Sequence, residues 1–476
     1  AAAQPALTKD DVQRVIESAA KAVDSNSMVI AVTDRQGDVL AVFRKPGAPE
    51  TAIGNFSKVV DANELAVALA RTAGFFSNGQ APLSSRTVRF ISGVHFPPGI
   101  LYTGSAALYG IENTNRGCLV VADYAPGKLI QGARSIDGST MGLGIITGKK
   151  DLFDSDPTAV NPGGVPLYKD GEVVGGVGVT GVGPDLAEYA AFIGSATAGF
   201  APTTIAAPGV VFIDGIALPF VDNTSAPGGI GLGRLEGTYV MDPRAAPGPA
   251  PEGDVIIPRA GPVGGLTAQE VRQIVDRAIE TANDTRAIIR LPLGSKARMV
   301  IAVADLDGQI LALHRMDDAT FFSVDVALAK SRNVIYFSSQ NRVPSDLPGV
   351  PLGTAVTNRT LGYGGQPFFP IGLDFTDPGP FFDLFKKDVE NPCTQGSQPA
   401  NGRQNGIVFF PGALPLYRNG VLIGGLGVSG DGVEQDDFVT AGGAKGFEPP
   451  TKIRADRVFI DGVRLPYIKF PRNPTQ

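Results

Sequence analysis

The stretch Met28–Arg44, MVIAVTDRQGDVLAVFR, recurs in the same chain as Met299–Arg315, MVIAVADLDGQILALHR. In each copy an alternating apolar run ends at an aspartate, passes two further residues and a glycine, and resumes as a second apolar run. Such alternation is typical of β-strands, and Gly37 or Gly308 can adopt the positive φ that a tight turn needs. The stretch therefore predicts a β-hairpin, and its repetition predicts two similar units in one polypeptide.

A helix is predicted before each hairpin. Thr8 is followed three residues later by Asp11, and Thr267 by Glu270, which is the pattern of a capping box. Apolar residues then recur every three or four positions in both copies, as they do on the buried face of an amphipathic helix.

A second, alanine-rich helix is predicted after each hairpin, where AVALAR at Ala66–Arg71 resembles DVALAK at Asp325–Lys330. Its small side chains would let it lie close to a sheet. Long Gly/Pro-rich loop insertions follow, at about residues 77–162 and 338–411. They share one similar stretch, Ser85–Ile100 and Asn358–Leu373, and ordered loops of this length usually serve function or assembly.

A second hairpin is predicted where GGVPLYKDGEVVGGVGVTG, Gly163–Gly181, matches GALPLYRNGVLIGGLGVSG, Gly412–Gly430. The turns fall at Asp170-Gly171 and Asn419-Gly420, residue pairs that two-residue primed turns favour. The glycines also match GxGxxG, but they lie inside a strand rather than between a strand and a helix, which predicts close backbone packing and not dinucleotide binding. A repeated FIDG segment near each repeat's end predicts a further short hairpin or edge strand.

Length and composition fit two packed domains. The 476 residues suit two cores of about 200 residues each. The net charge is −6, and the 41 basic residues are scattered among acidic ones, so we expect no nucleic-acid partner. No apolar run approaches the roughly 18 residues of a membrane helix, so we expect no membrane span.

The domain boundaries follow from the repeat. We expect a first repeat over residues 1–222, a Pro/Gly-rich linker over residues 223–264 that is apolar enough to pack on a domain surface, and a second repeat over residues 265–476. The alanine-rich start without an initiator Met fits the mature side of a signal-peptidase cut, although a trimmed chain would look similar. We therefore expect a secreted or periplasmic protein.

The two cysteines, Cys118 and Cys393, lie in corresponding loop regions, one in each repeat. In an oxidising compartment a single disulfide between the repeats is one interpretation. Two buried free thiols are the alternative.

Several of these motifs, in the same order in both repeats, resemble the GlcG/HbpS family of haem-binding or haem-interacting proteins. The motifs are Ile301–Ala319, Ser323–Arg332, Gly412–Gly430 and the residues Glu434-Gln435-Asp436, and the second repeat is the closer match. The resemblance implies an α/β (α+β) fold with two profilin- or PAS-like domains. Each would hold a central antiparallel sheet, flanking helices and the long loop insertions, with a tendency to form homo-oligomers.

Haem is the cofactor that the resemblance implies. Haem iron takes an axial ligand, commonly His, Cys, Met or Tyr, and the chain has two histidines. His314 lies in the closer repeat beside Arg315 and Met316, and His95 lies in the first loop insertion. We expect His314 to be the axial-ligand candidate and these four residues to be cofactor-binding candidates, with structural or surface histidines as the alternative. Many family members carry a histidine after the hairpin glycine, where this chain has Asp38 and Gln309.

Two functions remain open from the sequence. The first is an exported tandem GlcG/HbpS-like protein that binds haem or a related small molecule within a homo-oligomer. The second is a non-enzymatic assembly protein that forms oligomers or extracellular polymers through its loop insertions. No Ser/His/Asp order, Cys/His pair or zinc-ligand spacing is present, so no catalytic residue is predicted.

Overall fold

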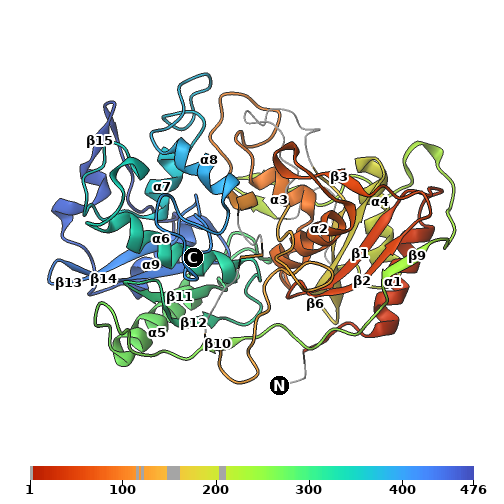
Figure 1. Ribbon diagram of the computed structural model, residues 1–476, viewed down its shortest axis with the longest axis horizontal. Coiled ribbons are helices and arrows are strands. Elements are labelled where there is room, and N and C mark those ends of the chain that lie inside the picture. The colour runs from red at the N-terminus through yellow and green to blue at the C-terminus, as the bar shows by residue number, and fades with distance from the viewer. Residues whose placement is uncertain (1–3, 114–116, 119–122, 147–160, 203–210) are drawn as a thin grey trace.

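The computed structural model describes residues 4–113, 117–118, 123–146, 161–202 and 211–476. Figure 1 shows the two repeats side by side, the first in red to yellow and the second in green to blue. Each repeat combines an antiparallel sheet with helices, which confirms the predicted α/β (α+β) class and the repeated architecture.

The first repeat is built on a five-stranded sheet in the order β5-β6-β1-β2-β9, with every neighbouring pair antiparallel. Strands β1 and β2 form the predicted first hairpin, and β5 and β6 form the second. The strands are β1 (Val29–Asp34), β2 (Val39–Arg44), β5 (Gly164–Lys169), β6 (Glu172–Thr180) and β9 (Thr238–Met241).

The second repeat has a matching sheet in the order β10-β12-β11-β14-β13. One edge strand of each sheet, β9 in the first repeat and β10 in the second, comes from residues 223–264, the segment predicted to be a linker that packs on a domain surface. This segment therefore adds one strand to each sheet. The strands are β10 (Gly253–Ile256), β11 (Val300–Asp305), β12 (Ile310–Arg315), β13 (Ala413–Arg418) and β14 (Val421–Ser429).

The turns have the predicted backbone conformations. In the β5–β6 turn Asp170 and Gly171 have φ values of 53° and 82°, and in the β13–β14 turn Asn419 and Gly420 have φ values of 52° and 77°. Positive φ at both central residues is the signature of the primed turn that suits the twist of a hairpin.

Helices cover both faces of each sheet. In the first repeat α2 (Ala62–Phe76) packs on one face, and α1 (Lys9–Lys21) and α4 (Pro184–Ala196) pack on the other. The corresponding helices of the second repeat are α6 (Ser323–Ser338), α5 (Ala268–Asp284) and α9 (Val433–Gly443). Alternate β1 residues face opposite layers, since Ile30 packs with α1 and α4 whereas Ala31 packs with α2.

The predicted helix starts and glycine contacts are both present. The Thr8 and Thr267 side chains accept hydrogen bonds from the amides of Asp11 and Glu270, which completes both capping boxes. A Cβ on Gly178 would lie 1.9 Å from the carbonyl oxygen of Ala66, so only glycine lets β6 approach α2 so closely.

The structure shifts one predicted alignment by two residues. Pairing Ala66–Arg71 with Asp325–Lys330 is wrong, because Gly178 contacts Ala66 whereas its counterpart Gly427 contacts Ala327. The short alternating Ala/Leu pattern matches in either register, and the contacts with the sheet decide between them. Arg71 therefore corresponds to Arg332.

Both loop insertions contain short helices that the sequence pattern did not predict. Helix α3 (Ser85–Ile91) in the first insertion corresponds to α7 (Asn358–Gly364) in the second, and α8 (Phe382–Glu390) follows α7. Two-stranded hairpins complete the fold: β3 (Thr51–Ile53) with β4 (Val59–Asp61), β7 (Phe212–Ile213) with β8 (Ile216–Ala217), and β15 (Phe459–Ile460) with β16 (Val463–Arg464). The last two are the FIDG segments.

The repeats contact each other through the C-terminal end of α2 and the N-terminal end of α6. Phe75 packs on Phe321 with ring centroids 5.5 Å apart, and Phe76 stacks on Phe322 at 4.1 Å. Phe75 and Phe76 correspond to Tyr336 and Phe337, at the other end of α6. The contact therefore joins two different faces of the repeated unit.

A disulfide links Cys118 to Cys393 across the repeat boundary. The sequence left open either a disulfide or two free thiols, and the structure contains the disulfide. Within the described part of the chain, no helix combines the length and the apolar character needed to cross a bilayer.

Candidate functional site

The first hairpin turn of each repeat is held by one buried arginine from the following helix. Arg71 Nε donates to the carbonyl oxygen of Gly37 at 2.8 Å, and Arg332 Nε donates to that of Gly308 at 3.0 Å. Burial lowers the pKa of Arg71 and of Arg332 to about 10. Both guanidinium groups thus position the turn that forms one wall of a cavity in each repeat.

The aspartate that ends the first strand of each hairpin orders the same turn. Asp34 Oδ1 accepts hydrogen bonds from the amides of Gln36 and Asp38, both at 2.9 Å. Asp305 does the same for the amides of Asp307 and Gln309. Burial, and then the neighbouring Asp38, raises the pKa of Asp34 to about 8. These bonds give the repeated aspartates a structural role.

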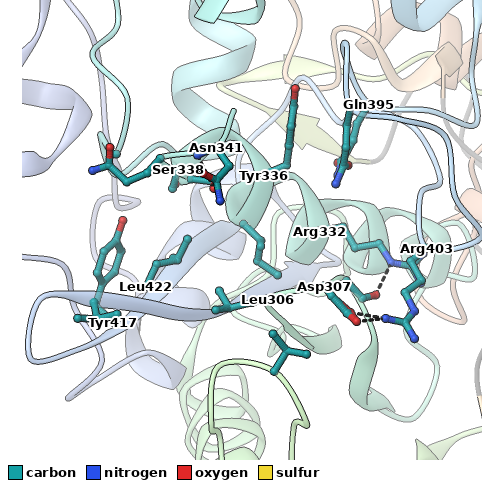
Figure 2. Close-up of a pocket in the computed structure, with 18 of the residues that line it drawn as sticks. Leu306, Asp307, Arg332, Tyr336, Ser338, Asn341, Gln395, Arg403, Tyr417 and Leu422 are labelled. Carbon is teal, nitrogen blue, oxygen red and sulfur yellow. Dashed lines mark hydrogen bonds and ion pairs between the residues drawn. The ribbon is translucent and has the colours of Figure 1, made fainter. Parts of the chain in front are cut away.

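A cleft of about 830 Å³ lies in the second repeat, between the two hairpin turns and the C-terminal end of α6. Figure 2 shows Tyr417 and Leu422 at one end of this cleft and Asp307, Arg332 and Arg403 at the other. The volume falls within the usual range for small-molecule pockets, about 300–1,000 Å³. We call it the second-repeat cleft; its lining includes Leu306, Asp307, Arg332, Tyr336, Asn341, Arg403, Tyr417 and Leu422.

One end of the second-repeat cleft carries two arginine side chains. Arg332 is buried, and beyond its bond to Gly308 its Nη1 donates to Asn405 Oδ1 at 2.9 Å, while its buried Nη2 has no hydrogen-bond partner. Arg403 forms an ion pair with Asp307 at the same end. The carboxylates of Asp307 and Asp325 balance the two guanidinium groups, and the unpartnered Arg332 Nη2 is the donor left for an anionic group.

The other end presents a buried phenol. Tyr417 is 4% exposed, and its hydroxyl lies beside the Ser338 side chain but has no backbone carbonyl as a partner. Burial raises the pKa of Tyr417, so the group is a neutral phenol in the free protein. Ser338 alone leaves this buried hydroxyl incompletely bonded, so a ligand atom in the cleft that bonds to it would be bound favourably.

The equivalent tyrosine hydroxyl of the first repeat has a backbone hydrogen-bond partner. Tyr168 corresponds to Tyr417, and its hydroxyl donates to the carbonyl oxygen of Asn78 at 2.8 Å. Asn78 in turn donates from Nδ2 to the carbonyl oxygen of Ile289 in the second repeat, at 2.9 Å. The face of the first repeat that corresponds to the second-repeat cleft is therefore covered by the second repeat.

The predicted haem residues around His314 have other partners. His314 Nδ1 lies 2.7 Å from Asp254 Oδ1 on the neighbouring strand β10, and the side chain lies outside the second-repeat cleft. Burial would raise the pKa of Asp254, but hydrogen bonds from Arg272 and His314 lower it overall. The Asp254 carboxylate, on edge strand β10, therefore orients the His314 ring.

Arg315 and Met316 are buried beside this histidine. The Arg315 guanidinium donates to the carbonyl oxygens of Ala319 and Pro251. Burial lowers the pKa of Arg315 to about 9. The Met316 sulfur accepts from the amide of Met299 at 3.4 Å. These contacts hold the end of strand β12.

His95 lies elsewhere, in the first loop insertion. Its Nδ1 is 3.2 Å from Asp374 Oδ1 of the second insertion, and its ring stacks on Phe368 at 6.0 Å between centroids. His95 is 2% exposed. The structure therefore uses His95 in the contact between the two insertions and does not bring it to the second-repeat cleft.

A larger cavity of about 1280 Å³ lies on the first repeat. Its wall mixes cations and carboxylates, including Asp38, Arg71, Arg134 and Glu252. Such a surface suits water better than an apolar ligand. We therefore take the second-repeat cleft as the candidate site. Across the described residues, no group of three or more His, Cys, Asp and Glu side chains is arranged to hold a metal ion.

Sequence reasoning missed the residues of this cleft. Tyr417 belongs to the PLY motif that both repeats share, so its duplication was visible, but only the structure separates the covered copy from the open one. Arg403 lies in the second loop insertion, which has no periodic pattern. The tyrosine repeated at positions 168 and 417 was the sequence signal for this cleft, whereas the resemblance to haem-binding proteins pointed to the histidines.

Comparison with known proteins gives a consistent result. The family model described as haem degrading protein HbpS-like matches residues 266–445. An uncharacterized 15.0 kDa protein from the dhaT-dhaS intergenic region of Citrobacter freundii is 31% identical over 138 residues, which is 29% of this chain and 68% of that protein.

Three solved structures are similar at lower identity, each over 38% of this chain. They are a PduOC:heme complex (22% identity, 96% of that chain, TM-score 0.25), Klebsiella pneumoniae protein ORFY (21%, 88%, 0.25) and a double mutant of Streptomyces reticuli HbpS (20%, 85%, 0.23). The family match covers the motifs of the second repeat, and the relative of 31% identity is matched over two thirds of its own length. The chain belongs to the HbpS-like family.

Proposed function

We propose that this protein binds haem, or a related planar and anionic small molecule, in the second-repeat cleft. Membership of the HbpS-like family supports a haem-type ligand. The observation that carries the proposal is the buried Tyr417 phenol at the end of an 830 Å³ cleft, because the equivalent tyrosine of the first repeat is bonded to a backbone carbonyl and covered by the second repeat.

The residues of the cleft fit haem in chemical type. Tyrosine is one of the axial donors that haem iron accepts in proteins. Arg332 and Arg403 are suited to the carboxylates of the haem propionates, because a guanidinium matches a carboxylate with two hydrogen bonds. Haem bound there would supply a redox-active iron. The apolar side chains of Leu306 and Leu422 would cover part of the ring.

The experiment that tests this proposal is a hemin titration followed by visible absorption. We expect saturable binding with a shifted Soret band, and we expect the His314→Ala variant to titrate like the wild type because His314 lies outside the cleft. A wild-type spectrum that equals free hemin at every ratio would remove haem as the ligand. Loss of binding only in His314→Ala would move the site to strand β12.

Export is part of the proposal. The disulfide between Cys118 and Cys393 supports it, because structural disulfides persist in oxidising compartments such as the periplasm and the extracellular space. Quantifying free thiols in protein isolated from its native host would test this. Two reactive thiols per chain after unfolding would contradict it.

Assembly is the second candidate function. One observation favours it. The face that holds the open cleft in the second repeat has an equivalent in the first repeat, and there the second repeat covers it. A contact between two different faces can continue from chain to chain, as heterologous contacts do in rings and filaments. Light scattering would test it, since a single species at the monomer mass over all working concentrations would count against homo-oligomers.

A further inference from the structure

A separate cavity of about 420 Å³ lies where the first loop insertion packs on the second repeat. One side comes from Ala106 and Tyr109 of the insertion, and the other from aromatic residues of the second repeat. We call it the boundary cavity; its second-repeat wall includes Tyr363, Phe409, Phe410, Arg359 and Lys469. None of the residues that line the second-repeat cleft lines this cavity.

The arginine of this wall has a fully paired counterpart in the first repeat. Arg86, which corresponds to Arg359, donates to Glu188 from Nε at 2.7 Å and from Nη2 at 3.2 Å. Its Nη1 also lies 3.0 Å from Asp222 Oδ2. Two carboxylates therefore contact all three nitrogens of the Arg86 guanidinium.

Arg359 lacks most of this compensation. The shorter Asp437 replaces Glu188, and it accepts only from Nε, at 2.6 Å. The buried Nη2 of Arg359 has no hydrogen-bond partner. A buried guanidinium nitrogen left without an acceptor is costly, so an acceptor brought by a ligand would be bound favourably.

The second carboxylate of the first-repeat arrangement is replaced by a cation. In the matching segments FIDGIALPFVD and FIDGVRLPYIK, Asp222 corresponds to Lys469. The Lys469 side chain is 66% exposed at the mouth of the cavity and pairs with Glu434. The position that pairs with the arginine as Asp222 in the first repeat is thus a lysine, Lys469, in the second.

We propose that the boundary cavity binds a small aromatic carboxylate, with its carboxylate on Arg359 and its ring among Phe409, Phe410 and Tyr363. Phe409 and Phe410 are both 2% exposed, so they form a rigid apolar wall. The cavity volume suits one ring with one acidic group and is about half that of the second-repeat cleft.

Calorimetric titration of the full chain with benzoate tests the proposal, and the first repeat supplies the decisive variant. Lys469→Asp recreates the Arg86–Asp222 arrangement, so it should pair Arg359, keep the fold and weaken benzoate binding at least tenfold. Benzyl alcohol, which has the ring without the charge, and acetate, which has the charge without the ring, should each bind at least tenfold more weakly than benzoate.

A Tyr417→Phe variant serves as the control for location and should bind benzoate like the wild type. Three results would overturn the proposal: no heat with millimolar benzoate on folded protein, equal benzoate binding by Lys469→Asp, or equal binding of acetate and benzoate. Thermal unfolding of each variant verifies that the fold is intact.

Discussion

Arg35 Nη2 of the first repeat lies 2.8 Å from Asp318 Oδ1 of the second, across the boundary between the repeats. Asp318 also accepts from Arg290 Nη1 at 2.7 Å and from the amide of Gly79 at 2.8 Å. Burial alone would raise the pKa of Asp318, but Arg35 and Arg290 lower it overall. One carboxylate thereby joins the first hairpin turn and the loop after α2 to the second repeat.

Replacing Asp318 should loosen the two repeats. Asp318→Ala leaves Arg35 without this carboxylate, whereas Arg290 keeps its ion pair with Asp431, and both arginine side chains are at least nine-tenths buried. We expect a loss of about 3–5 kcal/mol, the usual cost of breaking a buried ion pair. Thermal unfolding measures it, and Asp317→Ala is the matched control because the Asp317 side chain is 72% exposed. Equal unfolding temperatures for the two variants would contradict this role.

The disulfide should stabilise the same boundary. It closes a loop with a sequence separation of 275 residues, which restricts the unfolded chain. We expect Cys118→Ala with Cys393→Ala to lower the free energy of unfolding by about 2–5 kcal/mol. Denaturant titration with and without reductant checks this, because reductant should shift only the wild type. A wild type insensitive to reductant would argue against the bond.

The second repeat contains a buried ion pair for which the first repeat supplies an apolar equivalent. Lys330 Nζ donates to Asp436 Oδ2 at 2.9 Å, with both side chains buried, whereas the corresponding residues of the first repeat are Leu69 and Ala187. Lys330→Leu alone should cost about 3–5 kcal/mol because it leaves a buried carboxylate unpaired.

Combining Lys330→Leu with Asp436→Ala should restore stability to near that of the wild type, since both charges are then gone. A double-mutant cycle on the unfolding free energies measures the coupling. Losses that simply add in the double variant would mean that Lys330 and Asp436 are not energetically coupled, which would contradict this role of the pair.

The stability of the first repeat should depend on pH through Asp34. Burial raises its pKa from 3.8 to about 8, so the folded protein holds this proton where the unfolded chain has released it. Stability should therefore fall as pH rises from about 4 to about 8, by at most about 1.4 kcal/mol per pH unit. Asp34→Asn keeps the Oδ1 acceptor for the turn amides and should flatten this dependence. Parallel wild-type and variant profiles would contradict the assignment.

The sequence predicts the fold better than the site, and the reason is physical. Hairpins, capping boxes and turn residues are local, so Met28–Arg44 and Gly163–Gly181 could be read from alternation and glycine alone. Edge strands β9 and β10 are short and depend on a partner strand, and no local pattern reveals them. The state of a side chain such as Tyr417 depends on which repeat covers it, and the site could not be predicted for that reason.

The most direct test of the central claim is a hemin titration of two variants, Tyr417→Phe and Tyr168→Phe, which change equivalent positions of the two repeats. We expect Tyr417→Phe to weaken hemin binding at least tenfold with a smaller loss of stability than Tyr168→Phe, because its hydroxyl lacks the backbone carbonyl partner that Tyr168 has. Tyr168→Phe should bind hemin like the wild type and lose about 1 kcal/mol of stability with its bond to Asn78. Equal hemin affinities in the two variants would contradict a ligand site in the second-repeat cleft.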